Sequence, residues 1–549
     1  MIFFINANIQ KNKSGIEHAE LKRAALFRDH HEPFKILLQE WSPRLHENIA
    51  DAGLDDHDII NMFDYFQGTE TVSEQIIHAE DIDFGVPIDS YEEDSEHNRI
   101  LAFRTIKSSD GQIRQQLVAR VNFFKESVDK RVASTEMFDG FGNLYAVNFY
   151  DFRGFVSLIQ WYTQDNKIGT ESWQTPAGRV VLESFNKNDA VGKYEKSGWR
   201  LIEKNDTVYN FQTIEELTKY FLDLVNETYF DKQKPNIFIL DRSHLADWAL
   251  QNLKKPAYTV IHLHNSQAGD PNDEQHSVLN NHYEYVLWNA NRYDAIISAT
   301  HKQSRDVAAR FKPACKLFTI PVGVIPSEQF DQAHILMKDR QSHKVVALAR
   351  IAPEKRLNEL VKAVGIARKE VPDISLDLYG YRDGTDNFKA YRDIQTAVHD
   401  FGLEKVVNVH DYTTEVAKVE KQAQIFAVTS IMEGFNLSMM EGLSQGDVGL
   451  TYDVNYGPNE LVVDDENGYI VPYGDYRMLA QKMIYLFSHP DQLQQKSDRA
   501  YELSRRYSEQ NVWTAWQALL DDAQSSWSIK MMRYADPIMA GLAENGEAF

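Results

Sequence analysis

The chain has 549 residues, enough for about three or four domains, and 43% of them are hydrophobic, which is an ordinary globular composition. Its 58 basic and 81 acidic side chains give a net charge of −23, which argues against general nucleic-acid binding and against broad contact with anionic membranes. The single cysteine, Cys315, excludes an internal disulfide and a metal site built from several cysteines.

The chain opens with an apolar run from Ile2 to Ile5 that predicts a buried strand. This segment becomes polar too soon for a signal peptide, and no later apolar run approaches the ~20 residues of a membrane span. We therefore expect a cytoplasmic protein, with peripheral contact at the inner face of the cell membrane left open. A loop with Ser14 and Gly15, a helical pattern from Ile16 to Arg28 and a strand from Phe34 to Leu38 follow. This order is typical of the first βα unit of a doubly wound domain.

The pattern changes between about Phe66 and Thr207, where short alternating segments are separated by turn signals. Two of these signals are DGFGN at Asp139 to Asn143 and TPAG at Thr175 to Gly178. The pattern predicts an antiparallel β insertion, with strands near 117–124, 144–150, 155–162 and 180–185. Inserted sheets with exposed edges tend to pair, so we expect a role in oligomerisation or in acceptor docking.

An α/β pattern returns after the insertion. Thr213 and Glu216 predict a capping box at the start of a helix that runs to about Glu227. Three apolar runs then predict buried strands whose polar ends face the cleft of an open α/β sheet, at 236–240, 258–263 and 295–299. The sequence IPVGVIP, from Ile320 to Pro326, has the proline and glycine content of an interdomain connector.

A second α/β unit is predicted beyond this connector, with strands near 345–348, 376–379, 406–409 and 425–428. A helix should begin near Leu437, and a polar helical stretch should run from Met478 to Arg505. The tail around Trp513, Trp516 and Trp527 predicts a terminal helix.

The stretch from Ser430 to Asp453 carries the clearest chemistry. It follows a predicted strand, and Gly434 lets the backbone approach a ligand closely while the first amides of the next helix point into the crevice. Such a helix start is a seat for a phosphate. Glu433 and Glu441 flank this seat, where two carboxylates are costly unless something binds them, and sugar hydroxyls are the donors that we expect.

Cationic and histidine side chains follow two other predicted strands. Arg350 and Lys355 come after the first strand of the second unit, where two cations can offset the charge that grows on a diphosphate leaving group. His262 and His264 alternate on one strand and therefore face the same side. A histidine pair alone is more often structural, and no third metal ligand is placed by spacing, so we expect no metal.

The segments EGFNLSMME, with Glu433 and Glu441, and DVNYGPNELVVDDENGYIVP resemble the nucleotide-sugar site of the retaining glycosyltransferases of family four. This resemblance implies the GT-B fold, an α/β architecture in which two Rossmann-like domains face a cleft, here with the β insertion in the N-terminal domain. The implied division is an N-terminal domain at 1–65 and 211–335, the insertion at 66–210, a C-terminal nucleotide-sugar domain at 336–515 and a helical tail at 516–549 that crosses back.

The resemblance also implies roles for single residues. Glu441 grips the ribose, Glu433 faces the donor sugar, and Arg350 and Lys355 meet the leaving phosphate. His264, nearer the strand end than His262, contacts the sugar or orients the attacking hydroxyl. The remaining donor contacts are expected from Gly15, His262, Gly380 and Tyr412, and from the backbone of Gly434, Phe435, Asn436 and Leu437. The donor is UDP-GlcNAc or UDP-glucose, no cofactor or metal is expected, and retention implies front-face attack assisted by the departing phosphate.

Two subfamilies compete for the acceptor. SGIEHAELKRAALF, IINMFDYF, NNHYEYVLWNA and TIPVG resemble the bacterial transferases that start O-linked glycans on serine-rich adhesins. YTTE and DVNYGPNELV resemble the poly(glycerol-phosphate) α-glucosyltransferases of wall teichoic acid. A polyphosphate should be repelled by a net charge of −23, so serine and threonine of a protein acceptor are favoured.

A different class is a catalytically silent GT-B partner that binds the acceptor for a second enzyme. Such proteins usually lose the donor residues, whereas Arg350, Lys355, Glu433 and Glu441 are all present. The expected partners are therefore a nucleotide sugar, a serine-rich protein or teichoic acid, and a second copy or a GT-B subunit, but no nucleic acid.

Overall fold

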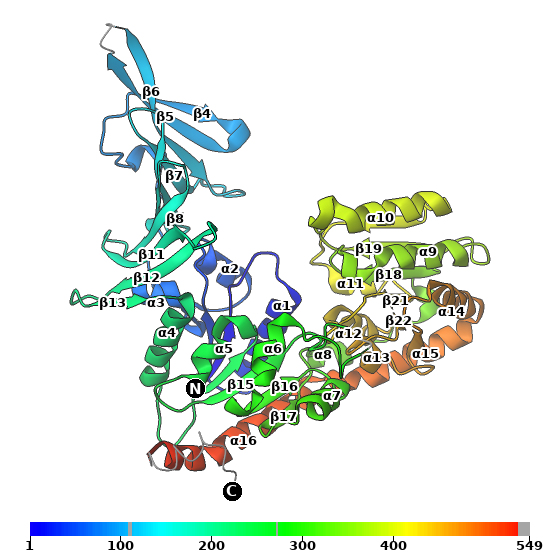
Figure 1. The fold of residues 1–549 in the computed structure, drawn as a ribbon. Helices are drawn as coiled ribbons and strands as arrows, with labels where there is room; N and C mark the ends of the chain where they lie inside the picture. Colours follow the sequence, from blue (N-terminus) through cyan, green and yellow to red (C-terminus); the bar gives the residue numbers. More distant parts are fainter. Residues whose placement is uncertain (108–111, 271–272, 536–549) are drawn as a thin grey trace. The chain divides into compact units, whose positions relative to one another are not determined.

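The structure is a computed structural model that describes residues 1–107, 112–270 and 273–535. The described residues fall into two compact units (Figure 1). The first unit comprises Met1–Lys13, Phe34–Lys232 and Asn236–Ala257, and the second comprises Ser14–Pro33, Gln233–Pro235 and the residues from Tyr258 on. Each unit is described by itself.

The first unit contains a parallel sheet. In it β1 (Ile2–Asn6) pairs with β2 (Phe34–Leu38) and with β14 (Ile237–Leu240), and β2 pairs with β3 (Ile59–Asn61). Every residue of β1 and β14 is buried, as the continuous apolar runs of these strands require in a parallel sheet. The helices of this part are α2 (Leu45–Asp51), α3 (Met62–Gln67), α4 (Ile214–Thr228) and α5 (Ser243–Gln251), with short turns η1 (Asp56–Asp58) and η2 (Ala79–Asp81).

The start of α4 differs in detail from the predicted capping box. The Thr213 side chain accepts a hydrogen bond from the Glu216 amide at 3.3 Å, as expected. The Glu216 carboxylate, however, accepts from the Gln212 amide at 2.7 Å instead of from Thr213. The reciprocal bond therefore reaches one residue further back.

The predicted β insertion is confirmed. Within the described residues it is one sheet of ten antiparallel strands, β4 to β13, each hydrogen-bonded to its neighbours in the sequence (Figure 1). The strands are β4 (Ser90–Asp94), β5 (Arg99–Lys107), β6 (Ile113–Phe123), β7 (Val132–Phe138), β8 (Leu144–Asp151), β9 (Phe155–Tyr162), β10 (Ile168–Gln174), β11 (Val180–Asn188), β12 (Tyr194–Ile202) and β13 (Val208–Phe211), with η3 (Ser95–His97) after β4.

A single turn geometry recurs between these strands. In each case the first residue donates its amide to the carbonyl of the fifth, and the fourth residue has a positive φ and donates to the carbonyl of the first. Glycine suits that fourth position because it has no Cβ, and asparagine and aspartate tolerate it better than other residues. In the described hairpins this geometry occurs at 139–143, 163–167, 175–179, 189–193 and 203–207, with Gly142, Asn166, Gly178, Gly192 and Asp206 in fourth place.

Buried polar contacts join the insertion to the rest of the first unit. The Arg153 guanidinium pairs with Asp151 at 2.8 Å and donates to the carbonyl of Thr69 at 2.6 Å. The Gln67 amide donates to the carbonyls of Ser157 at 3.0 Å and Gln174 at 2.6 Å. These bonds tie the middle of the antiparallel sheet to the segment around α3.

The second unit begins with a parallel group of strands, β15 (Tyr258–Leu263), β16 (Ala295–Ser298) and β17 (Lys316–Thr319). Helix α1 (Gly15–Asp29) belongs to this unit and starts with a full capping box between Ser14 and Glu17. The other helices here are α6 (Asn281–Trp288), η4 (Ala290–Arg292), α7 (His301–Phe311), α8 (Ser327–Phe330) and η5 (Met337–Asp339).

The predicted terminal helix is present as α16 (Glu509–Ala535). It packs on α1, where the rings of Trp513 and Trp516 each meet Phe27 edge to face at 5.4 Å. It also reaches β15, where the Tyr258 hydroxyl donates to Asp522 at 2.7 Å. The predicted tail extends to 549, and its residues 536–549 lie outside the described residues.

The second sheet of this unit has six parallel strands within the described part of the chain, in the order β20-β19-β18-β21-β22-β23. They are β18 (Lys344–Leu348), β19 (Ser375–Tyr379), β20 (Val407–His410), β21 (Ile425–Val428), β22 (Val448–Tyr452) and β23 (Gly468–Val471). Their helices are η6 (Pro353–Lys355), α9 (Leu357–Ala367), α10 (Thr385–Phe401), α11 (Val416–Glu420), α12 (Leu437–Ser444), α13 (Pro458–Leu461), α14 (Tyr476–Ser488), α15 (Pro490–Ser504) and η7 (Arg505–Tyr507).

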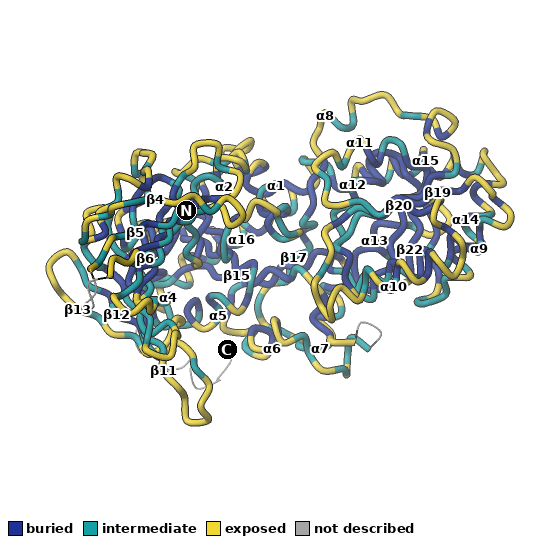
Figure 2. Tube along the Cα trace, turned by 90° about the horizontal axis from the view of Figure 1, so that it is seen from above, coloured by how far each residue is buried: buried dark blue, intermediate teal, exposed yellow. Residues whose placement is uncertain are grey.

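A buried ion pair links segments around this sheet. Arg340 and Asp447 lie 2.6 Å apart with both side chains fully buried. The Arg340 guanidinium also donates to the carbonyl of Ala423 at 2.7 Å and to the Tyr501 hydroxyl at 3.1 Å. In Figure 2 the tube at β15 and β22 is dark blue, which marks these strands as buried. The strand β17 is intermediate to exposed. Among the described helices, none is long and apolar enough to cross a bilayer.

Candidate nucleotide-sugar site

The predicted phosphate seat is the loop between β21 and α12. Helix α12 begins at Leu437, as predicted, and Asn436 caps it in a left-handed conformation, φ 77°, while its side chain accepts from the Met439 amide at 2.9 Å. Gly434 is required for a reason that differs from the prediction. A Cβ on Gly434 would collide with the carbonyl oxygen of His264, so the close approach is to the backbone after β15.

Phe435 can contribute only its backbone to a ligand. Its ring is 3% exposed and meets Tyr507 edge to face at 5.3 Å in the core. Leu437 and Met440 face the predicted connector, since a Cβ on Gly323 would meet both side chains. The side chains of this loop therefore hold it against the rest of the unit.

Lys355 and Glu433 come together in the structure. The Lys355 ammonium donates to Glu433 Oε1 at 2.6 Å, and the Ser430 hydroxyl donates to the same oxygen at 2.6 Å. The Thr429 hydroxyl also donates to the Lys355 carbonyl at 2.9 Å. The loops after β18 and β21 thus form one continuous surface. Because an ammonium has three N–H donors, Lys355 can hold Glu433 and a phosphate oxygen at the same time.

Arg350 lies at the end of β18 and pairs with two carboxylates, those of Glu354 and Asp383. Hydrogen bonds from Thr385 and the guanidinium of Arg350 lower the pKa of Asp383, so this carboxylate stays ionised beside Arg350. The contact of Arg350 and Lys355 with a diphosphate stays a prediction.

Glu441 is bound by a residue that the sequence patterns did not indicate. The Lys22 ammonium, on α1, lies 2.5 Å from Glu441 Oε1. We expected sugar hydroxyls to offset the electrostatic cost of placing Glu433 and Glu441 beside a phosphate seat. In the structure two lysines of the chain pair with these carboxylates, Lys355 with Glu433 and Lys22 with Glu441.

Helix α1 also touches two other predicted residues. The ring of His18 lies 3.3 Å from the Tyr412 hydroxyl, and the Arg23 guanidinium lies 3.2 Å from His262 Nδ1. Burial and the charge of Glu441 raise the pKa of Tyr412, which places this phenol near the Glu441 carboxylate. His18 and Lys22 are four residues apart and share one helix face, which is the only sequence signal that could have indicated them.

The two histidines of β15 and the loop after it face the same side, as predicted, with ring centroids 4.1 Å apart. His262 is 2% exposed and meets Trp516 edge to face at 6.1 Å. His264 is partly exposed, and its amide donates to the Tyr283 hydroxyl at 3.0 Å. Of the two rings, His264 is thus the accessible one.

The two remaining predicted glycines serve the local backbone. Gly15 is the first residue of α1, directly after the Ser14 cap. Gly380 follows β19 with φ 154°, and a Cβ there would collide with the carbonyl oxygen of Ala349. Gly380 thus allows the ends of β18 and β19 to pack, whereas the prediction gave it a close approach to the nucleotide.

The loop at 455–457, which follows β22, contacts the loop that carries Glu433 and Phe435. The Glu433 amide donates to the Asn455 carbonyl at 2.9 Å, and the Gln267 side chain donates to the Tyr456 hydroxyl at 2.5 Å. A Cβ on Gly457 would collide with the Phe435 carbonyl. The loop at 455–457 therefore supports Glu433 and Phe435 from behind.

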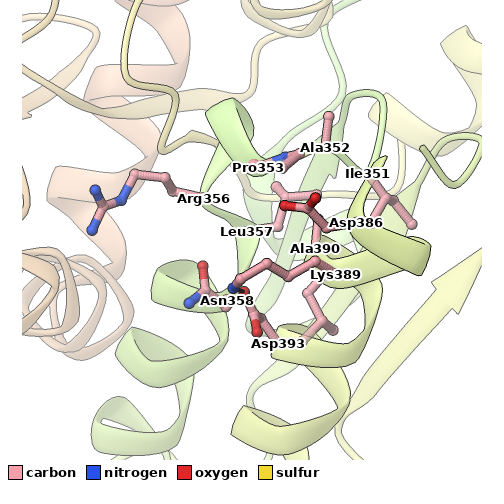
Figure 3. A pocket seen from close by; sticks show the side chains of 11 residues that line it. Ile351, Ala352, Pro353, Arg356, Leu357, Asn358, Asp386, Lys389, Ala390 and Asp393 are labelled. Atoms are coloured by element: carbon pink, nitrogen blue, oxygen red, sulfur yellow. Dashed lines mark hydrogen bonds and ion pairs between the residues drawn. The ribbon is translucent and has the colours of Figure 1, made fainter. Parts of the chain in front are cut away.

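A pocket of about 380 Å³ lies between η6, the start of α9 and α10 (Figure 3). It is lined by side chains such as Ile351, Leu357 and Lys389, while Arg356 points away from the other labelled side chains. Its described lining includes neither Arg350 nor Lys355, although Ile351, Ala352 and Pro353 lie between these two residues in the chain.

Residues 329–503 match the family described as glycosyl transferases group 1. This part of the chain is similar to a group 1 glycosyltransferase domain. It contains Arg350, Lys355, Gly380, Tyr412, Glu433 and Glu441, whereas Lys22 and His264 lie outside the matched residues.

Curated relatives extend the likeness beyond this domain. The UDP-N-acetylglucosamine--peptide N-acetylglucosaminyltransferase GtfA subunit of Streptococcus agalactiae is 24% identical over 551 residues, which cover 96% of this chain and 100% of the relative. The poly(glycerol-phosphate) alpha-glucosyltransferase of Bacillus subtilis is 27% identical over 381 residues, which cover 68% of this chain and 52% of the relative.

Solved structures confirm the predicted GT-B fold. The pneumococcal O-GlcNAc transferase GtfA in complex with UDP and GlcNAc is similar with a TM-score of 0.76 and 20% identity, over 95% of this chain and 98% of that one. TarM has a TM-score of 0.75 and 19% identity, over 94% of this chain and 98% of that one. Because these alignments cover nearly the whole chain, they include the β insertion.

Proposed function

We propose that this protein is a retaining glycosyltransferase that moves a hexose, GlcNAc in preference to glucose, from a UDP-sugar to hydroxyl groups of a bacterial cell-surface acceptor. One observation carries the proposal. Residues that the sequence patterns indicated separately lie together, with the Lys355 ammonium 2.6 Å from Glu433 and the Gly434 backbone against His264. The group 1 domain and the full-length GtfA relatives support the same reaction.

The chemistry follows from this arrangement. Lys355, Arg350 and the amides at the start of α12 take the diphosphate and stabilise the charge that grows on it as the bond from the anomeric carbon breaks. The acceptor hydroxyl attacks the same face, a new carbon–oxygen bond forms, and its proton passes to the departing phosphate oxygen, which leaves as UDP. Glu433, held by Lys355 and Ser430, faces the sugar, and His264 orients the attacking hydroxyl. In this scheme the donor site needs no metal.

Serine and threonine of a serine-rich protein are the favoured acceptor. The peptide transferases align with 95% or more of this chain, whereas the poly(glycerol-phosphate) enzyme aligns with 68% and the poly(ribitol-phosphate) enzyme of Staphylococcus aureus with 66%. The net charge of −23 also opposes a polyphosphate acceptor. Transfer to wall teichoic acid is the second candidate, supported by the poly(glycerol-phosphate) and poly(ribitol-phosphate) relatives.

A second GT-B subunit is the proposed partner. One similar structure is described as a GtfA/B complex, with a TM-score of 0.75 over 95% of this chain. The insertion, with open edges at β4 and β13, is the proposed contact for this subunit or for the acceptor. A silent role for this chain in such a pair is the third candidate, and peripheral membrane contact would come from the assembled complex.

Radiolabelled transfer tests these candidates together. The purified protein is incubated with UDP-GlcNAc or UDP-glucose and with a serine-rich repeat polypeptide, poly(glycerol phosphate) or poly(ribitol phosphate), each with and without a co-expressed GT-B subunit. We expect label from UDP-GlcNAc on the polypeptide and none with Lys355→Ala. Label on a polyphosphate alone would assign the protein to teichoic acid. No binding of UDP by calorimetry would favour the silent partner.

A further inference from the structure

Helix α1 places a lysine on the carboxylate that is predicted to hold the ribose. The Lys22 ammonium lies 2.5 Å from Glu441 Oε1 and 3.5 Å from the carbonyl oxygen of Val324. The side chains of Lys22 and Glu441 are 27% and 29% exposed, so water and salt screen this pair less than a surface pair. One ammonium thus links α1, the connector and α12.

The rest of α1 keeps this lysine in place. Phe27 packs between Trp513 and Trp516, and the Arg23 guanidinium lies 5.6 Å from the centre of the Trp516 ring. The ring of His18, one turn before Lys22, lies against the Tyr412 hydroxyl. The helix is therefore held from two sides, which fixes the position of the Lys22 backbone.

A second, buried carboxyl group senses the charges of both Lys22 and Glu441. Glu420, the last residue of α11, is 1% exposed, and its Oε1 has no hydrogen-bond partner among the described residues. Burial and the charges of Glu441 and Asp447 raise the pKa of Glu420, and the charge of Lys22 opposes this shift. The raised pKa favours the neutral form of Glu420, so Lys22 serves as the counter-charge of Glu441.

We propose that Lys22 is a positioning residue for the nucleotide: it holds the Glu441 carboxylate in the orientation in which its second oxygen accepts the ribose hydroxyls of the UDP-sugar. This inference rests on the proposed function. A carboxylate accepts through two oxygens, and Lys22 contacts Oε1, so Oε2 can accept from both hydroxyls of the ribose. The N-terminal part of the chain then contributes directly to donor affinity, outside the group 1 domain.

The test compares two ligands on variants of the full-length protein. Calorimetry measures the Kd of UDP and of 2′,3′-dideoxy-UDP, which lacks the ribose hydroxyls. We expect Lys22→Met to weaken UDP binding about tenfold and to leave dideoxy-UDP within about twofold of wild type. Lys22→Arg should restore most of the UDP affinity. In turnover assays Lys22→Met should raise the donor KM with little change in kcat.

The controls separate this role from a structural one. Lys418→Met removes an equal charge from an exposed position on α11 and should leave both ligands unchanged. Thermal melting checks the fold, and Lys22→Gln replaces Lys22→Met if the latter does not fold. Equal weakening of both ligands, tighter UDP binding or no change at all would each overturn the inference. Absence of UDP binding by the wild type would instead contradict the proposed function itself, and the inference would fall with it.

Discussion

The β insertion and the candidate site are built in opposite ways. In the insertion every described strand pairs with its neighbours in the sequence, and five of the hairpins close with the same five-residue turn. In the site, Lys22 and Glu441 are 419 residues apart, and His18 and Tyr412 are 394 apart. A substitution in the insertion should therefore act locally, whereas one in the site should affect segments that are distant in the chain.

The largest expected effect is on stability, from loss of the buried ion pair between Arg340 and Asp447. Arg340→Ala leaves Asp447 buried without its cation, which should destabilise the second unit by about 3–5 kcal/mol. Denaturant unfolding monitored by tryptophan fluorescence measures it. Arg499→Ala, which breaks exposed pairs with Glu466 and Glu502, should cost less than about 1 kcal/mol. Equal losses of unfolding free energy in the two variants would mean that the buried pair stabilises the second unit no more than an exposed pair does.

The next effect concerns turnover. Lys355→Ala should lower kcat by about 10²- to 10³-fold with a small change in donor KM, because the lysine stabilises charge that develops on the leaving phosphate. Initial rates of UDP release measure both constants. Lys389→Ala removes an exposed lysine that pairs with Asp393 on α10 (Figure 3), is the matched control and should turn over like wild type. Wild-type kcat from Lys355→Ala would remove this residue from the mechanism.

Glu441→Ala should act mainly on donor binding. Loss of the ribose contact should raise the Kd of UDP about 10- to 100-fold. Titration calorimetry on a folded variant measures this change, with Glu415→Ala on an exposed position before α11 as the control. Unchanged affinity would show that Glu441 serves only as a partner for Lys22.

The smallest effect belongs to the insertion. Gly192→Ala forces a side chain into a left-handed turn position, φ 85°, and should cost roughly 1 kcal/mol. Asn166→Gly, at the same turn position in another hairpin, should be neutral within about 0.5 kcal/mol. Thermal melting gives both values, and donor binding should not change. A loss of UDP affinity in Gly192→Ala would contradict the local character of the insertion.

The sequence predicted most of the elements because their signals are local. Two strands have the predicted first and last residues, Phe155–Tyr162 and Tyr258–Leu263. Helix α12 also begins at the predicted residue, Leu437. The strand β23 was missed, since four residues between a glycine turn and a proline leave little periodicity. The Lys22–Glu441 pair was missed for another reason. No local pattern records which lysine of an N-terminal helix meets a carboxylate 419 residues later.

The glycines show the same limit at single positions. Sequence reasoning assigned to Gly380 and Gly434 a close approach to a ligand, which stays a prediction. In the structure the carbonyls of Ala349 and His264 occupy the space that a Cβ would need. A glycine in the sequence can indicate a close contact, but the structure is needed to identify the atoms that make it.

The repeated turn of the insertion has a consequence for how this module can change its length. Because each described strand is registered only against adjacent strands, two successive strands and their turn can be removed or duplicated without altering the pairing elsewhere. The contacts of Arg153, Gln67 and Ser157 hold the middle of the sheet to the segment around α3. At the β13 end, the rings of Tyr209 and Phe211 pack on Tyr220 of α4. We therefore expect the hairpins between β4 and β7 to be the ones whose number can change with the least effect on the remaining structure.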